Sequence, residues 1–193
     1  MRLAQRLRAA LAAPPSSPPV EADLPELRNL AGISAAVLIA VTDRPEPGVI
    51  LTVRREHLRT HAGQIALPGG RVDPGEAPVA AALREAQEEL ALDPSAVDVI
   101  APLEEYRTVT GYSVTPVVGV VPPDLSLTPH DHEVADWFEA PLAHLLDSRH
   151  HQLETAVFAG RDRRYWQIEW DGRRIWGATA AMIINLSRRL QWP

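Results

Sequence analysis

Three acidic residues, Glu85, Glu88 and Glu89, fall within little more than one turn of an expected helix. Residues three and four apart are neighbours on a helix, and like charges at that spacing repel by about 0.2–0.5 kcal/mol. A hard divalent cation would offset the repulsion, because Mg²⁺ takes carboxylate oxygens, keeps several waters and completes its shell with substrate phosphates. The cluster therefore predicts metal-assisted chemistry on a phosphate group.

The helix that carries these acids has an apolar side for packing. At about 100° per residue, its apolar residues share one sector, with the acids in the sector beside it. These apolar residues are Val79, Ala82, Leu83, Ala86 and Leu90. Either Pro74 or Pro78 fits the first helical position, where the missing N–H costs nothing. A start at Pro74 would put Gly75 in the first turn, so we expect the helix to begin at Pro78.

The surrounding residues extend the acidic cluster into a recognisable motif. The segment 70–92 resembles the signature box of the Nudix hydrolases. It has Gly70, five residues, Glu76, seven residues and then the run 84–92 (REAQEELAL). That box reads G, five spacers, E, seven spacers, then R-E-U-x-E-E-x-G-U, with U apolar. One position departs from it, because Ala91 stands where the family usually has the glycine that ends the helix.

The resemblance implies a fold and a set of roles. The Nudix fold is an α/β/α sandwich, a mixed β-sheet between helices, and the order of expected elements agrees with it. The metal ligands would be carboxylates and one backbone carbonyl, with Mg²⁺ or Mn²⁺ as the cofactor. These ligands are Gly69, Glu85, Glu88 and Glu89.

The remaining box residues would be structural. Glu76 would pair with Arg84 to hold the loop, as a bidentate arginine–carboxylate pair does well, and Gly70 would belong to the same scaffold. The group that activates the attacking water stays open between a box glutamate and an acid from a later loop. Glu133 is the later acid that we expect.

A second resemblance lies directly before the box. Residues 50–70 are similar to the motif L-L-T-x-R, three or four spacers, R, three spacers, G, three spacers, F-P-G-G, which marks the Nudix branch that cleaves coenzyme A. Two residues depart from it: Arg55 stands where the motif has a small residue, and Leu67 stands where it has phenylalanine. The resemblance implies a coenzyme A substrate, contacted by four residues of this segment. They are Arg54, Arg59, Gly63 and Gln64.

Three functions are compatible with these motifs. The first is hydrolysis of the diphosphate of coenzyme A, its thioesters or its oxidised forms. The second is the same reaction on another nucleoside diphosphate derivative, such as ADP-ribose. The third is a non-catalytic ligand sensor on the same fold. Sensors generally lose box glutamates and this chain keeps them, so a hydrolase is expected.

The composition agrees with a cytoplasmic enzyme. The 193 residues contain no cysteine, which excludes disulfides and thiolate metal sites, and their net charge of −6 disfavours a nucleic-acid partner. No apolar run approaches the roughly 20 residues of a membrane span. The expected partner is a small-molecule substrate, and a homodimer stays open.

We expect two parts in the chain, an N-terminal helix with a Pro-rich spacer (1–20) and a single hydrolase domain (21–193). The first is expected to pack on the domain or on a neighbour. Strands are expected at 34–41, 49–53, 97–103, 113–121, 137–139, 156–158 and 165–170, with a final helix at 178–190. Trp176 is interpreted as core packing rather than a stacking platform. Thr110, Gly111 and Tyr112 either shape the pocket or form a turn.

Overall fold

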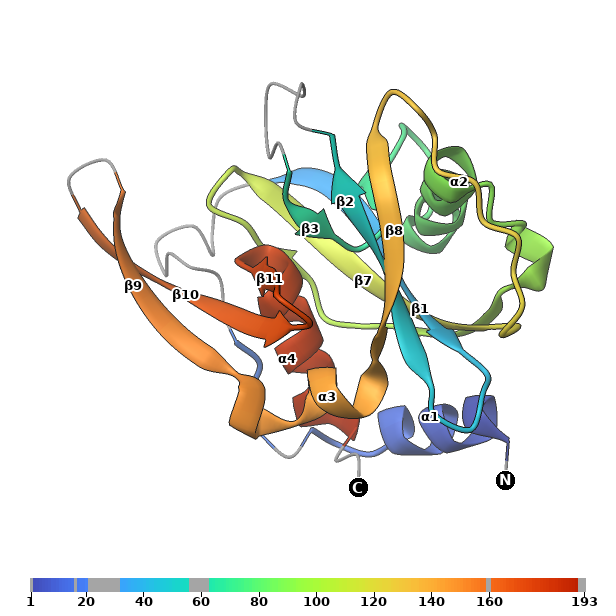
Figure 1. The fold of residues 1–193 in the computed structure, drawn as a ribbon, viewed down its shortest axis with the longest axis horizontal. Coiled ribbons are helices and arrows are strands. Elements are labelled where there is room, and N and C mark those ends of the chain that lie inside the picture. Colours follow the sequence, from blue (N-terminus) through green and yellow to red (C-terminus); the bar gives the residue numbers. More distant parts are fainter. Residues whose placement is uncertain (1, 16, 21–31, 56–62, 159–160, 191–193) are drawn as a thin grey trace.

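The central element is a mixed β-sheet, shown in Figure 1. The computed structural model describes residues 2–15, 17–20, 32–55, 63–158 and 161–190, with only the backbone at residues 158 and 161. The main strand order is β3-β2-β1-β7-β5. These strands are β1 (Ile33–Thr42), β2 (Gly48–Arg54), β3 (Ile65–Ala66), β5 (Asp98–Pro102) and β7 (Tyr112–Val121). Only β1 and β7 pair in parallel among the described strands; the other pairs are antiparallel.

Three further strands extend this sheet, and two of them were not expected. β4 (Gly69–Arg71) pairs with the start of β1, and β6 (Tyr106–Arg107) pairs with β7. β8 (Val134–Pro141) pairs with β2 and is longer than the expected segment 137–139. Strands of two or three residues carry too little alternation to be predicted from sequence. β4 nevertheless matters most here, because it carries both glycines of the box.

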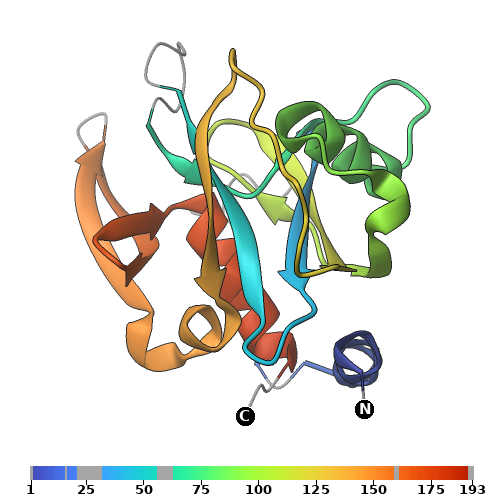
Figure 2. The same ribbon diagram turned by 45° about the vertical axis from the view of Figure 1, so that its right-hand side comes forward.

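Helices cover both faces of the sheet, as expected for an α/β/α sandwich. The box helix α2 (Pro78–Leu90) begins at Pro78 as the sequence predicts, and the final helix α4 (Ala178–Leu190) has the predicted bounds. Along β1, Ala36, Leu38 and Ala40 pack in the cluster under α2, whereas Ala35 and Ile39 pack in the cluster under α4. This alternation is the period of two of a strand buried on both sides. Figure 2 shows α2 (green) and α4 (red) on opposite sides of β1 and β2.

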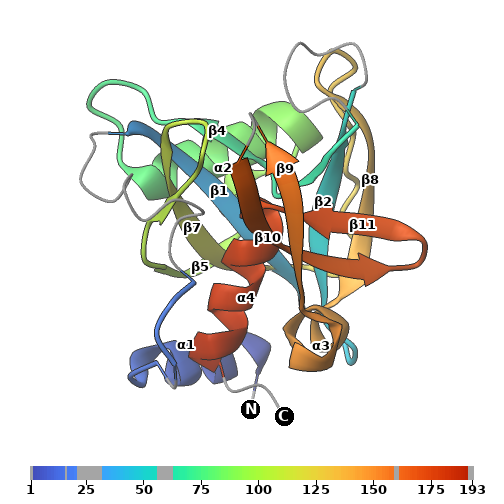
Figure 3. The same ribbon diagram turned by 90° about the vertical axis from the view of Figure 1, so that its left-hand side faces the viewer.

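A second, three-stranded sheet stands beside α4, as seen in Figure 3. It contains β9 (Gln152–Phe158), β10 (Arg161–Trp170) and β11 (Arg173–Trp176), which follow the short helix α3 (Leu142–Leu146) and a 3₁₀ turn (Ser148–His150). Ile168 and Ile175 are fully buried, and the ring of Trp170 stacks on Phe138 of β8 at 5.7 Å between centroids. The inner ends of β10 and β11 therefore share the core.

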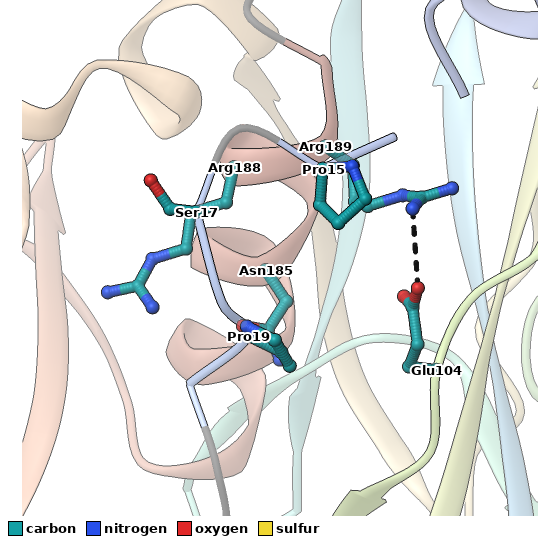
Figure 4. Close-up of a pocket in the computed structure, with 7 residues that line it drawn as sticks. All are labelled: Pro15, Ser17, Pro19, Glu104, Asn185, Arg188 and Arg189. Carbon is teal, nitrogen blue, oxygen red and sulfur yellow. Dashed lines mark ion pairs between the residues drawn. The ribbon is translucent and has the colours of Figure 1, made fainter. Parts of the chain in front are cut away.

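The N-terminal segment packs on the same core. Helix α1 (Leu3–Ala12) places Leu3, Leu7 and Leu11 on one buried face, as their spacing of four residues allows. Beyond it the chain crosses α4, where the N–H of Val20 donates to Asn185 Oδ1 at 2.6 Å and Asn185 Nδ2 donates to the Val20 carbonyl at 3.2 Å. Figure 4 shows this crossing, with the ion pair of Arg189 and Glu104 next to it. In the part of the chain described, no helix is long and apolar enough to cross a membrane.

Candidate active site

The box helix ends on an unusual residue. α2 stops at Leu90, and Ala91 adopts the left-handed conformation at φ 55° and ψ 27°. The N–H of Ala91 donates to the Gln87 carbonyl and that of Leu92 to the Ala86 carbonyl, so these two carbonyls of the last turn are satisfied. Alanine therefore performs the stop usually made by glycine, in a conformation that is costly for a residue with a Cβ.

The three box glutamates differ in their exposure. α2 buries Ala81, Ala82, Ala86 and Leu90 against the sheet. In the adjoining sector the Glu89 side chain is 4% exposed and that of Glu85 is 15% exposed. The Glu88 side chain, one ridge further out, is 59% exposed. A single turn thus carries one buried, one half-buried and one solvated carboxylate.

Arg84 organises the loop before the helix. Its Nε and Nη2 donate to the two carboxylate oxygens of Glu76, both at 3.0 Å, in the bidentate geometry that the sequence analysis expects. Nη2 also donates to the Arg71 carbonyl, and Nη1 donates to Glu85 Oε1, both at 2.9 Å. Glu88 lies 3.4 Å from Nη1. The hydrogen bond from Arg84 lowers the pKa of Glu76, and the carboxylates of Glu76 and Glu85 raise the pKa of Arg84.

The two glycines of β4 allow the helix to approach the sheet. A Cβ on Gly70 would run into the carboxylate of Glu85, and one on Gly69 would run into the backbone of β1. The Gly69 N–H donates to Glu89 Oε2 at 3.1 Å. Glycine is needed at Gly69 because the backbone of β1 leaves no room for a Cβ, whereas at Gly70 the neighbour is the end of the Glu85 side chain.

Glu89 has the most perturbed pKa of the three box glutamates. Burial raises its pKa to about 7, against the opposing effects of the Gly69 N–H and of Arg54, whose Nη1 lies 3.8 Å from Glu89 Oε1. The charges of Glu85 and Glu133 raise it further. Burial also raises the pKa of Glu85, partly offset by Arg84, with Glu88 and Glu133 adding to the rise. The carboxylates together hold more negative charge than their own partners neutralise.

Glu133 reaches this cluster from a distant part of the chain. The loop before β8 passes the end of α2, where the His130 N–H donates to the Glu89 carbonyl at 2.8 Å. The Glu133 N–H donates to the His130 carbonyl at 3.0 Å, and the Glu133 carbonyl accepts from the Arg55 N–H at 3.1 Å. The charge of Glu133 raises the pKa values of Glu85 and Glu89, so the structure brings this expected acid into electrostatic range of the box.

The upstream motif meets the box through β2 and β3. The Arg54 N–H donates to the Gln64 carbonyl at 2.9 Å, and the Gly63 N–H donates to the Arg54 carbonyl at 3.0 Å. These bonds hold three of the four expected substrate-binding residues together, and the Arg54 guanidinium lies 3.8 Å from Glu89. The fourth, Arg59, lies outside the described residues.

The donor set fits a hard divalent cation. All the side chains are carboxylates, which suit Mg²⁺ and Mn²⁺ rather than a thiophilic metal. Buried acids with raised pKa values are groups that a cation would stabilise. Within the described ranges no three acidic or histidine side chains converge closely enough to hold an ion as they stand, because Arg84 holds Glu85 and Glu88 while Gly69 and Arg54 hold Glu89.

Two features near the site differ from the sequence interpretation. Trp176 is 37% exposed and meets Tyr165 edge-on at 5.7 Å between centroids, so interpreting it as core packing was wrong. It ends β11, a strand with one buried and one outer face. Sequence reasoning also missed Arg71, whose guanidinium bonds to the Tyr112 hydroxyl. No sequence signal indicates that pair, which is formed by residues 41 positions apart.

Comparisons with known proteins agree with this geometry. Residues 32–159 match the NUDIX domain family. The chain is 49% identical over 158 residues to an uncharacterized Nudix hydrolase, NudL, of Escherichia coli O1:K1, covering 81% of this chain and 82% of that one. NudL of Shigella boydii serotype 18 matches equally. Among solved structures, the Nudix hydrolase RenU of M. smegmatis superposes with a TM-score of 0.51 at 26% identity, over 57% of this chain and 71% of that one. The chain therefore belongs to the Nudix family of pyrophosphohydrolases.

Proposed function

We propose that this Nudix hydrolase cleaves the diphosphate of coenzyme A or its thioesters. The products are adenosine 3′,5′-bisphosphate and 4′-phosphopantetheine or its acyl form. The observation that carries the proposal is the position of the upstream motif, whose Arg54 and Gly63–Gln64 ends close one hairpin with the Arg54 guanidinium 3.8 Å from Glu89. A motif that resembles the coenzyme A branch thus adjoins the acids of the box.

The box residues would bind the cofactor. Glu85, Glu88, Glu89 and the Gly69 carbonyl would hold Mg²⁺ or Mn²⁺, which neutralises phosphate oxygens and lowers the pKa of bound water. Arg54 would face the diphosphate from β2, where it already compensates part of the charge of Glu89. Arg84 would keep Glu85 and Glu88 oriented while Glu76 holds Arg84 in place.

Glu133 is our candidate for the base that accepts the proton of the attacking water. It lies on a loop that is hydrogen-bonded to the end of α2, and its charge acts on Glu85 and Glu89. The box glutamates would be occupied by the cation, whereas Glu133 is outside the box and free for proton transfer. A positioned carboxylate of this kind contributes about 10²–10⁴-fold to a hydrolysis.

A product assay tests the proposal. The purified protein with Mg²⁺ or Mn²⁺ is offered coenzyme A, acetyl-coenzyme A, ADP-ribose, NADH and a dinucleoside polyphosphate, and the products are identified by mass. We expect the highest kcat/KM on coenzyme A or its thioester, with adenosine 3′,5′-bisphosphate released. A higher kcat/KM on ADP-ribose or a dinucleotide would leave the enzyme class intact and contradict the substrate.

A further inference from the structure

We infer that Arg71, held in place by Tyr112, binds a second anionic group of the substrate on the face of the sheet opposite the box helix. The inference rests on the proposed function, in which the second group is the 3′-phosphate of coenzyme A. The scissile diphosphate would lie on the α2 face, and the ribose phosphate would reach around the short strand β4.

The register of β4 places Arg71 on that opposite face. Gly70 pairs with Ala36 and faces α2, since a Cβ on Gly70 would meet Glu85. Arg71 pairs with Ala35, which packs in the cluster under α4. Directly opposed residues of an antiparallel pair share a face, and successive residues alternate. Arg71 therefore directly follows Gly69 and Gly70 of the box, yet it points to the other side of the sheet.

Among the residues that the structure describes, no carboxylate compensates the charge of Arg71. The Arg84 guanidinium is shared among Glu76, Glu85 and Glu88, and that of Arg54 lies beside Glu89. No ion pair links Arg71 to an acid anywhere in the described ranges; its side-chain hydrogen bonds go to the neutral hydroxyl of Tyr112. A guanidinium next to an active site with its charge available is suited to a phosphate, which it can bind through two parallel hydrogen bonds.

Tyr112 preorganises the guanidinium. The Nε and Nη2 atoms of Arg71 lie 3.3 and 3.0 Å from the Tyr112 hydroxyl, and the guanidinium carbon lies 5.6 Å from the ring centroid. The Tyr112 backbone is itself tied down, because its N–H donates to Thr108 Oγ1 at 3.0 Å and its carbonyl accepts from the Thr108 N–H at 2.9 Å. Ordering a long side chain before binding lowers the entropic cost of binding.

Apolar side chains next to the pair suit the base of a nucleotide. Ile33, the partner of Tyr112 in the parallel pair of β1 and β7, is 47% exposed, and Val109 in the preceding turn is 38% exposed. Exposed large apolar residues are few in the described chain. Of these two, Ile33 neighbours Tyr112 by strand register and Val109 by sequence. The surface thus offers a cation with apolar neighbours, the combination that a phosphorylated nucleoside needs.

Hydrolysis of coenzyme A and of 3′-dephospho-coenzyme A by the Arg71→Ala variant tests the inference. We expect kcat/KM for coenzyme A to fall about 10- to 100-fold, mainly through KM, and that for the dephospho form to fall less than about threefold. Tyr112→Phe should raise KM for coenzyme A by about three- to tenfold with kcat unchanged, and Arg71→Lys should recover part of the loss. Equal losses on both substrates, or none, would overturn the inference.

Arg174→Ala is the matched control. Arg174 forms the same kind of pair, donating to the Tyr165 hydroxyl at 2.6 Å, in the other sheet. Its removal should not change the preference for the 3′-phosphate. If Arg174→Ala lost that preference as Arg71→Ala does, our assignment would be contradicted.

Calorimetric binding of adenosine 3′,5′-bisphosphate and AMP separates this inference from the proposed hydrolysis of coenzyme A. If wild type prefers the bisphosphate and Arg71→Ala does not, the inference holds even where coenzyme A is not hydrolysed; no preference in wild type overturns it.

Discussion

Two helices of equal length cover the two faces of the sheet, and they bury very different groups. α4 buries nine of its 13 residues, most of them apolar. α2 buries five of 13, and one of these is the carboxylate of Glu89. Since hydrophobic burial is the main favourable term in folding, α4 contributes more to stability. α2 instead keeps a charged sector that does not contribute to the hydrophobic core.

Their buried polar groups differ in the same way. On α4, Asn185 bonds to both backbone groups of Val20, and Thr179 donates to the Ile65 carbonyl. On α2, Glu89 receives one backbone N–H and an arginine at 3.8 Å, and its pKa stays raised. A satisfied polar group stabilises the fold, while an undercompensated one is a cost that a bound cation can remove. The comparison predicts that substitutions on α2 change rate and those on α4 change stability.

Glu88→Gln should give the largest effect. The side chain is 59% exposed, so the fold tolerates the change, but one charge of the cation site is lost. We expect kcat to fall by about two to four orders of magnitude with little change in melting temperature. Steady-state kinetics with Mg²⁺ and a thermal melt measure both. Glu46→Gln, in the exposed turn between β1 and β2, is the control, and near-normal turnover of Glu88→Gln would contradict the metal site.

Ile183→Ala should produce the reverse pattern. Ile183 is 1% exposed on α4, and truncating a buried isoleucine costs about 2–5 kcal/mol of unfolding free energy. Urea denaturation should show that loss, while kcat at a temperature where the variant is folded stays within about twofold. A large fall in kcat of the folded variant would mean that α4 also shapes the site.

Glu89→Gln should stabilise the metal-free protein at high pH. The folded-state pKa of about 7 lies above the ordinary 4.5, so the folded protein binds more protons between these values. Its unfolding free energy therefore falls as the pH rises from about 4.5 to 7 and stays low above that. Glutamine does not titrate, so the variant should match wild type near pH 4.5 and exceed it by about 1–3 kcal/mol at pH 8.

Urea denaturation in EDTA at pH 4.5, 6 and 8 measures this difference. Added Mg²⁺ should raise the stability of wild type at pH 8 and leave Glu89→Gln nearly unchanged, because the ligand is lost. Below pH 7 protons compete with the cation, so wild-type affinity for Mg²⁺ should fall with decreasing pH. A wild-type stability that is flat from pH 4.5 to 8 in EDTA would refute the burial cost of Glu89.

Ala91→Gly should give the smallest effect. Ala91 holds φ at 55°, where glycine has no steric penalty, although glycine also gains entropy in the unfolded chain. We expect the unfolding free energy to rise by about 0.5–1 kcal/mol with kcat unchanged. A thermal melt against Ala96→Gly, in the nearby 3₁₀ turn where no left-handed residue is needed, provides the comparison. A loss of stability at Ala91 would show that its conformation is not strained.

Much of the fold could be predicted because its signals are local. Pro78 marks the start of the box helix, and the apolar runs of β1 and β7 mark strands covered on both faces. The strands β3, β4 and β6 could not be predicted, because two or three residues form a strand only when a partner is already in place. The exposure of Trp176 was missed for a related reason, since a tryptophan at a strand end shows no sign of which face it takes.

The spacing of Gly70, Glu76 and Arg84 with the acids determined the box by itself, because residues on one loop and one helix are positioned by local geometry. Tertiary structure alone decided which acid is buried, which arginine keeps its charge available and which distant loop delivers Glu133. Those properties depend on contacts between residues far apart in the chain. Burial and charge compensation are sums over every neighbour, and the neighbours are known only once the sheet, the two helices and the loop before β8 are assembled.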